Sequence, residues 1–560
     1  MLNNQFINEK YKLWIKKATD DLDLIEELKA MNEATIIDAF SQNMRFGTGG
    51  IRGIIGAGTN RINIYTVAKI SQGVSSYIKS FKGGKHSIAI SFDSRIKSQL
   101  FAKIAATVFA SNNIHVYLYK ELMPTPCLSF AVRFLECDAG VMITASHNPG
   151  RYNGYKVYGS DGCQITVRAT QTIMEASERI DELEIDLHGY ETYLYKGLIE
   201  YIEEKVYIAF IEKVKKQSVL SEFIDRNMII VYTPLNGTGL KPVTDILYET
   251  GFKNLTIVAE QEQPDGRFLT CPYPNPEIHE ALELGLSYCK RVNADLLLAT
   301  DPDCDRCGVA VKSEYESYKL LSGNEIGILL LDFICSQRIK NKTMPAHPIF
   351  VKTIVTTDLA EQIANYYGVK TVNVLTGFKY IGEIIGDLER ENRESDYICG
   401  FEESYGYLTG TYIRDKDGVN AAFMICEMMA YYKSHGSSLL KELQRIYKMF
   451  GYCLNTLHTF DFDTASGVII MKQIMGKFRR DIKTIGTKKI VSVIDYNDGV
   501  DGLPKSDVIK LKLEGNCSVV VRPSGTEPKI KVYISIIGEN YNVASVTERY
   551  IFNELTKFFI

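Results

Sequence analysis

Short apolar runs rich in β-branched residues recur along the chain from Ser87 onward, and longer helical patterns separate most of them. In chain order the runs are SIAISF, HVYLY, GVMITA, MIIVYT, LTIV, ADLLLA, PIFVKTIV and KTVNVL. An alternation of strands and helices is typical of βαβ units, in which helices connect parallel strands. The pattern therefore predicts α/β domains with mixed, mostly parallel sheets.

The two ends of the chain follow other patterns. Residues 1 to about 45 carry apolar positions at mixed helical spacing among many charges, which predicts amphipathic surface helices. These apolar positions are Leu13, Ile15, Leu22, Leu24, Ile25 and Leu28. After Tyr452, turn residues join the closely spaced runs KKIVSVI, VIKLKLE, CSVVVRP and KIKVYISI. This last pattern predicts a smaller α+β domain with antiparallel pairing.

The length of 560 residues corresponds to three or four domains at about 150 residues each. We expect N-terminal helices and a first α/β domain in residues 1–205, a second α/β domain in 206–322 and a third in 323–450. The α+β domain is expected in residues 451–560. No short-period repeat is visible, although the middle of the chain could hold three α/β units of roughly 110 to 160 residues, a size typical of single domains.

The composition is that of an ordinary globular protein, with 45% hydrophobic and 24% charged residues. This composition excludes a disordered or low-complexity chain. The 64 Lys and Arg residues nearly balance the 68 Asp and Glu residues, and no long basic run occurs. Nucleic acid is therefore not an expected partner, because the electrostatic attraction to its phosphates has no source here.

Hydropathy and cysteine usage favour a cytoplasmic protein. The longest apolar run, Ile326 to Leu331, stops at Asp332, far short of the roughly 18 residues that would span a bilayer. The N-terminus has charged residues where a signal peptide needs an apolar stretch. The 12 cysteines are scattered, and the pair Cys304 and Cys307 has no second pair at zinc-finger spacing. We expect no membrane segment, no disulfide framework and no zinc site.

The first segment that could carry chemistry is TASHNP, residues 144–149, which follows the strand-like run 140–143. A serine at the carboxyl end of a parallel strand lies where open α/β sheets bind ligands. The alternative is a simple turn, because Ser, Asn and Pro are turn formers. A Ser-His-Asp hydrolase is disfavoured, since the Gly-x-Ser-x-Gly elbow is missing and His147 is expected to point away from the Ser146 side chain.

The second segment is DPDCDR, residues 301–306, directly after the apolar run ADLLLA. Carboxylates at alternate positions can converge on one hard cation when the loop curls, and oxygen ligands suit Mg²⁺. An EF-hand is excluded, because Arg306 and Lys312 stand where that loop needs Gly and Glu. The remaining alternative is an acidic surface turn. Mutual repulsion of Asp303 with its two neighbours favours a bound metal over that alternative.

Two further loops suit a phosphorylated sugar. Acids and a hydroxyl between glycines in GFEESYG, residues 400–406, can hydrogen-bond to vicinal hydroxyls, although paired glutamates are often simply solvated. RPSGTEPK, residues 522–529, combines an arginine, hydroxyls, a glycine and a lysine, as in a phosphate cradle, with a plain strand connection as the alternative. Together, the four segments indicate phosphoryl transfer on a sugar.

In order and spacing, TASHNP, DPDCDR, GFEES and RPSGTEP resemble the phosphoserine, metal, sugar and phosphate loops of the α-D-phosphohexomutase superfamily, most closely its phosphoglucomutase branch. The resemblance covers nearly the whole chain. It implies three α/β domains and a fourth of another kind, arranged as a heart around a central cleft. It also implies that Ser146 carries the phosphoryl group, and that Asp301, Asp303 and Asp305 hold Mg²⁺ together with one oxygen of that group.

The resemblance extends to further residues. Lys156 and Lys416 match lysines that serve as general acid or base, and Arg52, His147 and Arg306 match polar positions of the cleft. The implied sugar and phosphate contacts are Thr376, Gly377, Glu402, Ser404, Arg522, Ser524, Gly525, Thr526 and Lys529.

One departure bears on the substrate. The dual-specificity phosphomannomutase/phosphoglucomutases have a histidine two residues after the sugar-loop serine, where this chain has Gly406. We therefore expect interconversion of glucose 1-phosphate and glucose 6-phosphate through glucose 1,6-bisphosphate, by a monomer or weak homodimer. The alternatives are a phosphopentomutase, which the surroundings of Phe401 and Tyr405 also resemble, a phosphomannomutase, a phosphatase-like hydrolase or a non-catalytic sugar-phosphate sensor.

Overall fold

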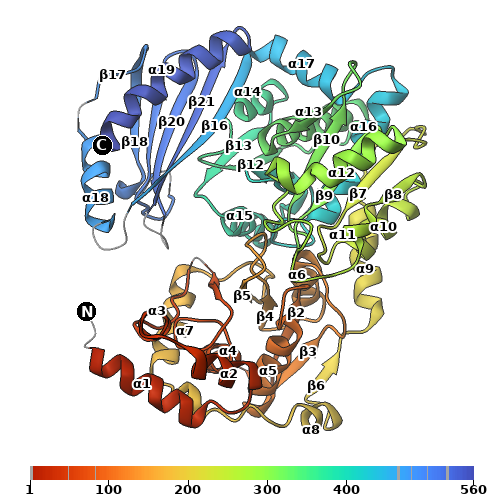
Figure 1. The fold of residues 1–560 in the computed structure, drawn as a ribbon. Helices are drawn as coiled ribbons and strands as arrows, with labels where there is room; N and C mark the ends of the chain where they lie inside the picture. Colours follow the sequence, from red (N-terminus) through yellow and green to blue (C-terminus); the bar gives the residue numbers. More distant parts are fainter. Residues whose placement is uncertain are drawn as a thin grey trace.

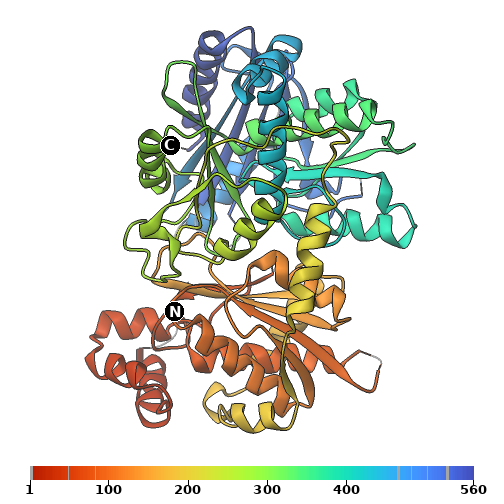
Figure 2. The same ribbon diagram turned by 90° about the vertical axis from the view of Figure 1, so that its right-hand side faces the viewer.

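The computed structural model describes residues 4–47, 49–81, 83–462, 467–480, 482–500, 502–524 and 529–559. Four β-sheets follow one another around the molecule in chain order, and the N-terminal and C-terminal parts face each other across its open side (Figure 1). Helices cover the sheets, as the view from the side also shows (Figure 2). The expected α/β fold class with a different last domain is confirmed.

The first sheet has the strand order β1-β5-β4-β2-β3-β6. Its strands are β1 (Gly50–Ile54), β2 (His86–Phe92), β3 (Ile114–Leu118), β4 (Ala139–Ile143), β5 (Tyr152–Gly159) and β6 (Ile199–Tyr201). The helices around it are α4 (Ile64–Lys79), α5 (Ser98–Ser111), α6 (Thr125–Phe134), α7 (Val167–Glu178) and α8 (Tyr190–Tyr195), with a 3₁₀ turn at Glu182–Glu184. Alternate residues of β2 and β4 pack on opposite faces, against α6 on one side and α4 and α5 on the other.

The second sheet has the order β11-β10-β9-β7-β8, with a parallel centre and an antiparallel edge. Its strands are β7 (Ile230–Thr233), β8 (Leu255–Ile257), β9 (Leu296–Thr300), β10 (Cys307–Lys312) and β11 (Tyr318–Leu321). The accompanying helices are α9 (Glu204–Lys215), α10 (Leu240–Glu249), α11 (Ala259–Glu262) and α12 (His279–Val292). The β9–β10 turn is the DPDCDR loop.

The third sheet has the order β13-β12-β14-β15, again with an antiparallel edge. Its strands are β12 (Ile349–Thr353), β13 (Lys370–Val374), β14 (Tyr397–Glu402) and β15 (Gly406–Leu408). Its helices are α13 (Gly323–Lys340), α14 (Leu359–Tyr366), α15 (Phe378–Arg390), α16 (Gly418–Ser434) and α17 (Leu439–Phe450), with a 3₁₀ turn at Glu394–Asp396. The connection between β14 and β15 lies in the GFEESYG segment, residues 400–406.

The fourth sheet is antiparallel throughout its described pairs, in the order β16-β21-β20-β19-β18-β17. Its strands are β16 (Tyr452–Asp461), β17 (Thr484–Ile485), β18 (Lys488–Asp495), β19 (Ile509–Leu513), β20 (Cys517–Pro523) and β21 (Lys529–Gly538). Helices α18 (Gly467–Phe478) and α19 (Tyr541–Phe559) cover one face, and a 3₁₀ turn lies at Tyr496–Asp498. Val520 and Tyr533, on the other face, pack against Ile354 and Leu375 of the third unit.

Each of the expected domain ranges, 1–205, 206–322, 323–450 and 451–560, contains one of these sheets, and we propose them as the four structural units. No helix among the described residues is long and apolar enough to cross a bilayer.

The N-terminal helices form as expected, and Leu24 and Leu28 are buried, but the apolar positions expected in the first helix do not face the core. The helices are α1 (Asn4–Lys17), α2 (Leu22–Ala30) and α3 (Glu33–Phe40). Leu13, Ile15 and Leu22 are exposed, whereas Trp14 is buried between the rings of Phe40 and Tyr65. The large indole ring buries more area than any single leucine, so it sets which side of α1 faces the core.

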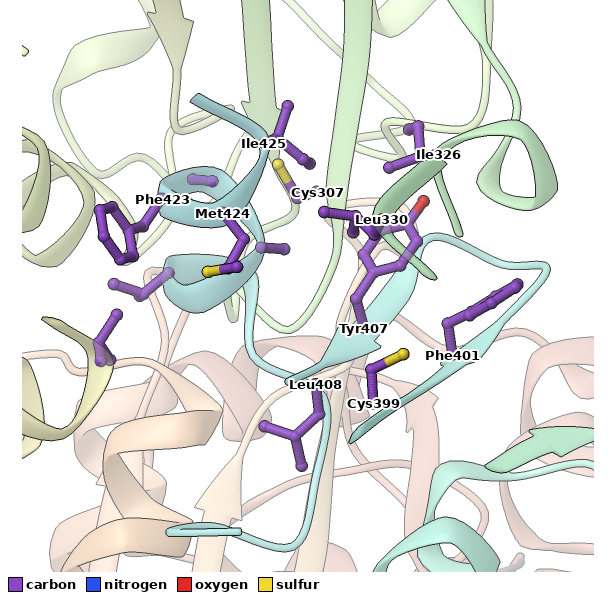
Figure 3. Packing of buried hydrophobic residues seen from close by; sticks show 14 of the residues in the cluster. Cys307, Ile326, Leu330, Cys399, Phe401, Tyr407, Leu408, Phe423, Met424 and Ile425 are labelled. Atoms are coloured by element: carbon purple, nitrogen blue, oxygen red, sulfur yellow. The ribbon is translucent and has the colours of Figure 1, made fainter. Parts of the chain in front are cut away.

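One apolar cluster joins the DPDCDR loop (residues 301–306) to the GFEESYG loop (residues 400–406) (Figure 3). Cys307 follows the first loop, while Phe401 and Tyr407 flank the second, and all three side chains are buried in this cluster. Phe401 packs on α13 at Gly327, where a Cβ atom would lie only 2.2 Å from its ring. Close-packed interiors resist displacement, so the packing of this cluster favours one relative position of the two loops.

Candidate active site

Ser146 lies in a tight turn just beyond the carboxyl end of β4. Its φ of 51° is in the left-handed region, which is uncommon for a residue with a side chain and marks a strained turn. Its N–H donates to Thr144 Oγ1 at 2.7 Å, and Arg95 donates to its carbonyl and to that of Asn148. Arg95 also donates to the carbonyl of Tyr152 at 2.9 Å, so one buried guanidinium holds the whole turn.

The Ser146 hydroxyl faces the DPDCDR loop. Its Oγ donates to Asp301 Oδ2 at 2.9 Å, and His147 Nδ1 lies 3.2 Å from the same oxygen. The expectation that His147 points away is therefore wrong, because the left-handed turn at Ser146 brings the next side chain back to it. Burial, with the nearby charges of Arg306 and Arg52, lowers the pKa of His147 well below its usual value, so the imidazole is neutral at pH 7.

Asp301, Asp303 and Asp305 converge after β9. Each offers one carboxylate oxygen, these oxygens lie within 4.8 Å of one another, and all three residues are buried. A left-handed residue, Cys304, makes the sharp turn that brings the alternate aspartates together. The Asp301 Oδ1 atom accepts the N–H groups of Asp305 and Arg306 at 3.1 and 3.0 Å, which fixes the loop.

The carboxylate cluster fits a divalent metal ion. Asp303 Oδ1 and Asp305 Oδ1 are buried and have no hydrogen-bond partner among the described residues. Burial, followed by the charges of Asp305 and Asp303, raises the pKa of Asp301 well above its usual value. A hard cation would satisfy the two oxygens and remove the repulsion, and carboxylate oxygens are ligands that such cations prefer.

Two lysines approach the aspartates from different units. Lys156 of β5 lies 2.7 Å from Asp303 Oδ2 and 3.2 Å from Asp305 Oδ2. Lys416, just before α16, lies 3.1 Å from Asp305 Oδ2 and 3.1 Å from Asp415 Oδ1. Burial acts to lower both lysine pKa values, but the neighbouring carboxylates outweigh it and raise them.

Gly406 makes room for Lys416. A Cβ atom at Gly406 would lie 2.1 Å from Cδ of the lysine, so no larger residue fits without moving that side chain. In the same loop, the buried Glu402 accepts the N–H of Gly377 at 2.9 Å, which joins the β14–β15 loop to the segment before α15. The two expected sugar-contacting segments are thus brought together.

A cavity of about 1030 Å³ lies among the four units, and eight of the predicted site residues line it. These residues are Arg52, His147, Lys156, Arg306, Thr376, Ser404, Arg522 and Ser524. Lys529 instead lies near Asp461, at 3.9 Å. Gly525 and Thr526 lie outside the described residues.

Sequence reasoning missed three residues at this site. Arg95 holds the serine turn and follows β2, so the signal that pointed to Ser146, a polar residue after a strand, could have found it. Glu277, in a loop without a preceding strand, lines the cavity and forms an ion pair with Arg306. Lys531 of β21 also lines the cavity.

Family comparisons match most of the chain. Models of the phosphoglucomutase/phosphomannomutase α/β/α domains I, II and III match residues 43–184, 205–314 and 322–447. Phosphoglucomutase of Staphylococcus epidermidis is 36% identical, covering 90% of this chain and 93% of its own. Phosphoglucomutase of Staphylococcus aureus is 34% identical, covering 95% and 96%.

Solved structures share the fold at lower identity. A putative phosphomannomutase from Thermus thermophilus has a TM-score of 0.69 and 21% identity, covering 92% of this chain and 99% of its own. Parafusin, a phosphoglucomutase from Paramecium in its open form, has a TM-score of 0.67 and 15% identity, covering 92% and 96%.

The four-unit fold and its relatives define an intramolecular phosphotransferase, that is, an isomerase of the α-D-phosphohexomutase superfamily. Within that superfamily, the chain belongs to the phosphoglucomutase/phosphomannomutase family.

Proposed function

We propose that this protein is a Mg²⁺-dependent phosphoglucomutase that interconverts α-D-glucose 1-phosphate and glucose 6-phosphate. The observation that carries the proposal is the Ser146 hydroxyl, 2.9 Å from Asp301 within a buried cluster of three aspartates. Relatives of 34 to 36% identity are named phosphoglucomutase, which supports glucose as the sugar.

Asp301, Asp303 and Asp305 would hold the Mg²⁺ ion, because their buried oxygens include two without another partner. When bound, the ion supplies positive charge that offsets the negative charge of a phosphoryl group on Ser146. The residues of this chain do the remaining work of binding the substrate, orienting it and moving a proton.

Ser146 carries the phosphoryl group between substrates. In the first half-reaction the bond from phosphorus to Ser146 Oγ breaks, and a bond to the free sugar hydroxyl forms, which gives glucose 1,6-bisphosphate. The sugar hydroxyl loses a proton and the serine oxygen gains one, so charge and atoms balance. The bisphosphate then turns within the cavity and returns its other phosphoryl group to Ser146.

Lys156 and Lys416 are the proposed proton-transfer groups. Both reach the aspartate loop from outside it, at 2.7 to 3.2 Å from Asp303 or Asp305, and the Ser146 hydroxyl contacts Asp301 of the same loop. Neighbouring carboxylates keep both lysines protonated in the free protein, so either can donate a proton to the departing serine oxygen. His147, neutral and 3.2 Å from that oxygen, and Arg52 complete the polar surroundings.

The remaining predicted residues are proposed to hold the substrate. Glu402, Ser404, Thr376 and Gly377 would contact sugar hydroxyls. Arg306, Arg522, Ser524, Gly525, Thr526 and Lys529 would contact phosphate. Glu277 is proposed to position Arg306 through their ion pair.

Initial rates with glucose 1-phosphate, mannose 1-phosphate and ribose 1-phosphate test the proposal, with Mg²⁺ and a trace of glucose 1,6-bisphosphate present. We expect kcat/KM to be highest for glucose 1-phosphate, with no release of inorganic phosphate. A higher value for ribose or mannose 1-phosphate would show a phosphopentomutase or a phosphomannomutase instead. Phosphate release would indicate a hydrolase, and binding without turnover a sensor.

The proposal includes a cytoplasmic monomer or weak homodimer that does not bind nucleic acid. Cell fractionation, light scattering at several concentrations and a nucleic-acid shift assay test these three points.

A further inference from the structure

The segment PDGRF, residues 264–268 of the second unit, packs directly against the serine turn of the first unit, residues 144–150. A Cβ atom at Gly266 would lie 2.7 Å from the Cα atom of Arg95, which holds that turn. A Cβ atom at Gly150 would lie 2.8 Å from the carbonyl oxygen of Gly266. Neither glycine could carry a side chain without a shift of the backbone, so the two units are in close contact here.

Phe268 supports the arginine that holds the serine turn. Its side chain is fully buried, and the centroid of its ring lies 5.1 Å from the Cζ atom of Arg95. A cation within about 6 Å of a ring centroid is attracted to the ring, and more strongly where both groups are out of water. Arg95 is only 3% exposed, and its guanidinium donates to backbone carbonyls of the turn, including that of Ser146. The ring therefore restrains the group that restrains Ser146.

The backbone of Phe268 is strained. Its φ of 49° is in the left-handed region, where a bulky residue is a genuine outlier. Such a conformation persists only where the surrounding structure over-determines it, and it is concentrated at functional sites. Here the N–H of Phe268 donates to the carbonyl of Asp265 at 3.1 Å, and the carbonyl of Phe268 accepts the N–H of Cys271 at 3.0 Å. The loop thus holds the ring in a position that an unconstrained chain would not favour.

The same segment is connected to the DPDCDR loop through Asn236. The carbonyl of Asn236 accepts the N–H of Asp265 at 3.1 Å, and its Nδ2 donates to the carbonyl of Gln263 at 2.8 Å. Two residues later, Thr238 donates both its N–H and its hydroxyl to the carbonyl of Pro302, at 2.8 and 2.9 Å. A continuous chain of contacts therefore runs from the aspartate loop to the serine turn.

We propose that the PDGRF segment, through Phe268, is a positioning element that sets the place of the Ser146 hydroxyl relative to the three aspartates. The inference rests on the proposed function, in which Ser146 carries the phosphoryl group. Ser146 and Asp301 belong to different units, and their 2.9 Å contact depends on how those units meet. Phosphoryl transfer relies on positioning and on electrostatic stabilisation, so a small displacement of the serine oxygen should slow it.

The substitution Phe268→Leu removes the ring and keeps an apolar side chain. Phe252→Leu is the matched control, because Phe252 is also a fully buried residue of the second unit with an arginine near its ring. The Cζ atom of that arginine, Arg226, lies 5.7 Å from the ring centroid. Arg226 approaches Glu427 of α16, at 3.9 Å, and not the serine turn. The two variants therefore lose the same kind of contact at different places.

Hydrogen–deuterium exchange read by mass spectrometry follows the serine turn without substrate or turnover. In Phe268→Leu and in Gly266→Ala, the amides of residues 144–152 should exchange at least about fivefold faster than in the wild type, because the turn opens more easily. Phe252→Leu and Gly84→Ala should stay within about twofold of the wild type. Gly84→Ala is the glycine control, because no other described atom lies within 4 Å of its Cβ position. Unchanged exchange in Phe268→Leu would overturn the inference, and where that variant fails to fold, Gly266→Ala decides in its place.

Steady-state kinetics separate a positioning role from a structural one. Phe268→Leu and Phe252→Leu both lose a buried ring, so their melting temperatures should fall alike. In Phe268→Leu, kcat and kcat/KM for glucose 1-phosphate should both fall about tenfold, as expected when an interaction acts on the transition state. Phe252→Leu should keep the wild-type values. Equal kcat in the two variants would overturn the inference and assign Phe268 a purely structural role.

The inference and the proposed function fail separately. A wild-type protein without activity on glucose 1-phosphate contradicts the function, whereas the exchange experiment needs no activity and reads only whether the segment holds the serine turn. Wild-type exchange and wild-type kcat in Phe268→Leu contradict the inference and leave the function standing.

Discussion

A partly buried aspartate, Asp358, connects the third and fourth units. It accepts from Lys510 of β19 at 2.7 Å, from Lys352 of β12 at 3.1 Å and from Ser518 of β20 at 3.0 Å. Lys352 is fully buried and Lys510 nearly so. We predict that Asp358→Asn, which preserves shape and removes the charge, weakens the attachment of the fourth sheet.

The magnitude follows from these contacts. Each hydrogen bond to a charged group contributes about 1.5–3 kcal/mol, and breaking a buried ion pair costs about 3–5 kcal/mol. Lys352 retains Glu361 at 3.2 Å, and Lys510 retains the Ile354 carbonyl at 3.3 Å, so part of the interaction survives. We therefore expect Asp358→Asn to lower the free energy of unfolding by about 3 kcal/mol, near the lower limit for a broken buried ion pair.

The stabilisation by the Asp358 carboxylate decreases as the pH falls. Burial acts to raise the pKa of Asp358, but Lys352 and Lys510 outweigh it and hold that pKa below its usual value. The stabilisation is therefore fully present above the unfolded-state pKa of about 3.9, and it is lost as the pH falls from there through the lower folded-state pKa. The difference between wild type and Asp358→Asn should be constant near pH 7 and shrink below about pH 4.

Differential scanning calorimetry at pH 7 measures the effect. For a domain of about 100 residues, 1 kcal/mol shifts the melting temperature by about 4 °C or more, so a loss of about 3 kcal/mol should lower the transition of the fourth unit by about 12 °C or more. Asp387→Asn is the matched control, because Asp387 pairs with Arg390 on the surface and exposed pairs contribute little. A shift of less than about 2 °C in Asp358→Asn, or full additivity with Lys510→Met, would refute the reasoning.

Four further outcomes are expected. Ser146→Ala should abolish turnover while the protein remains folded, and intact-mass analysis should find about one phosphate on the wild type and none on the variant. Chelation should remove activity, and added Mg²⁺ should restore it. Asp303→Asn should lower the rate roughly 10²- to 10⁴-fold. Full activity in excess chelator would contradict a metal site. Arg522→Ala should lower kcat/KM more than tenfold in both directions, with Arg522→Lys in between, and an unchanged value in either direction would contradict the phosphate role. Gly406→Ala should lower kcat by displacing Lys416 while the melting temperature changes little, whereas wild-type kinetics would show that the lysine tolerates the methyl group.

The β-branched apolar runs predicted their strands correctly, and several short or glycine-containing strands were missed. All eight runs from SIAISF to KTVNVL contain strands. β4, β7, β9 and β12 are buried at every position, as strands covered on both faces are, whereas β3, β8 and β13 are only partly buried. The missed strands include β1, β5, β10, β14 and β15. Several of these strands border the site. In β5, for example, the cavity-lining Lys156 interrupts the apolar pattern, so the pattern did not predict a strand there.

The sequence predicted which loops form the site, but it did not predict all the side-chain contacts between them. Ser146 and the three aspartates follow buried strands, and the structure brings Ser146 Oγ to 2.9 Å from Asp301 Oδ2 across 155 residues of sequence. The contact of His147 with the serine was not predictable, since it depends on a left-handed backbone at Ser146. Glu277 was not predictable either, because its ion pair with Arg306 needs two loops of the second unit to meet.

The sequence by itself determined the fold class, the family and the chemistry of each loop, because periodicity and short motifs are local properties of the chain. Only the tertiary structure decided which charges meet. Lys156 and Lys416 reach one aspartate from different units, and Arg522 faces Lys531 through strand register. Such pairs join residues far apart along the chain, and their geometry depends on how whole sheets pack, which no local pattern of residues encodes.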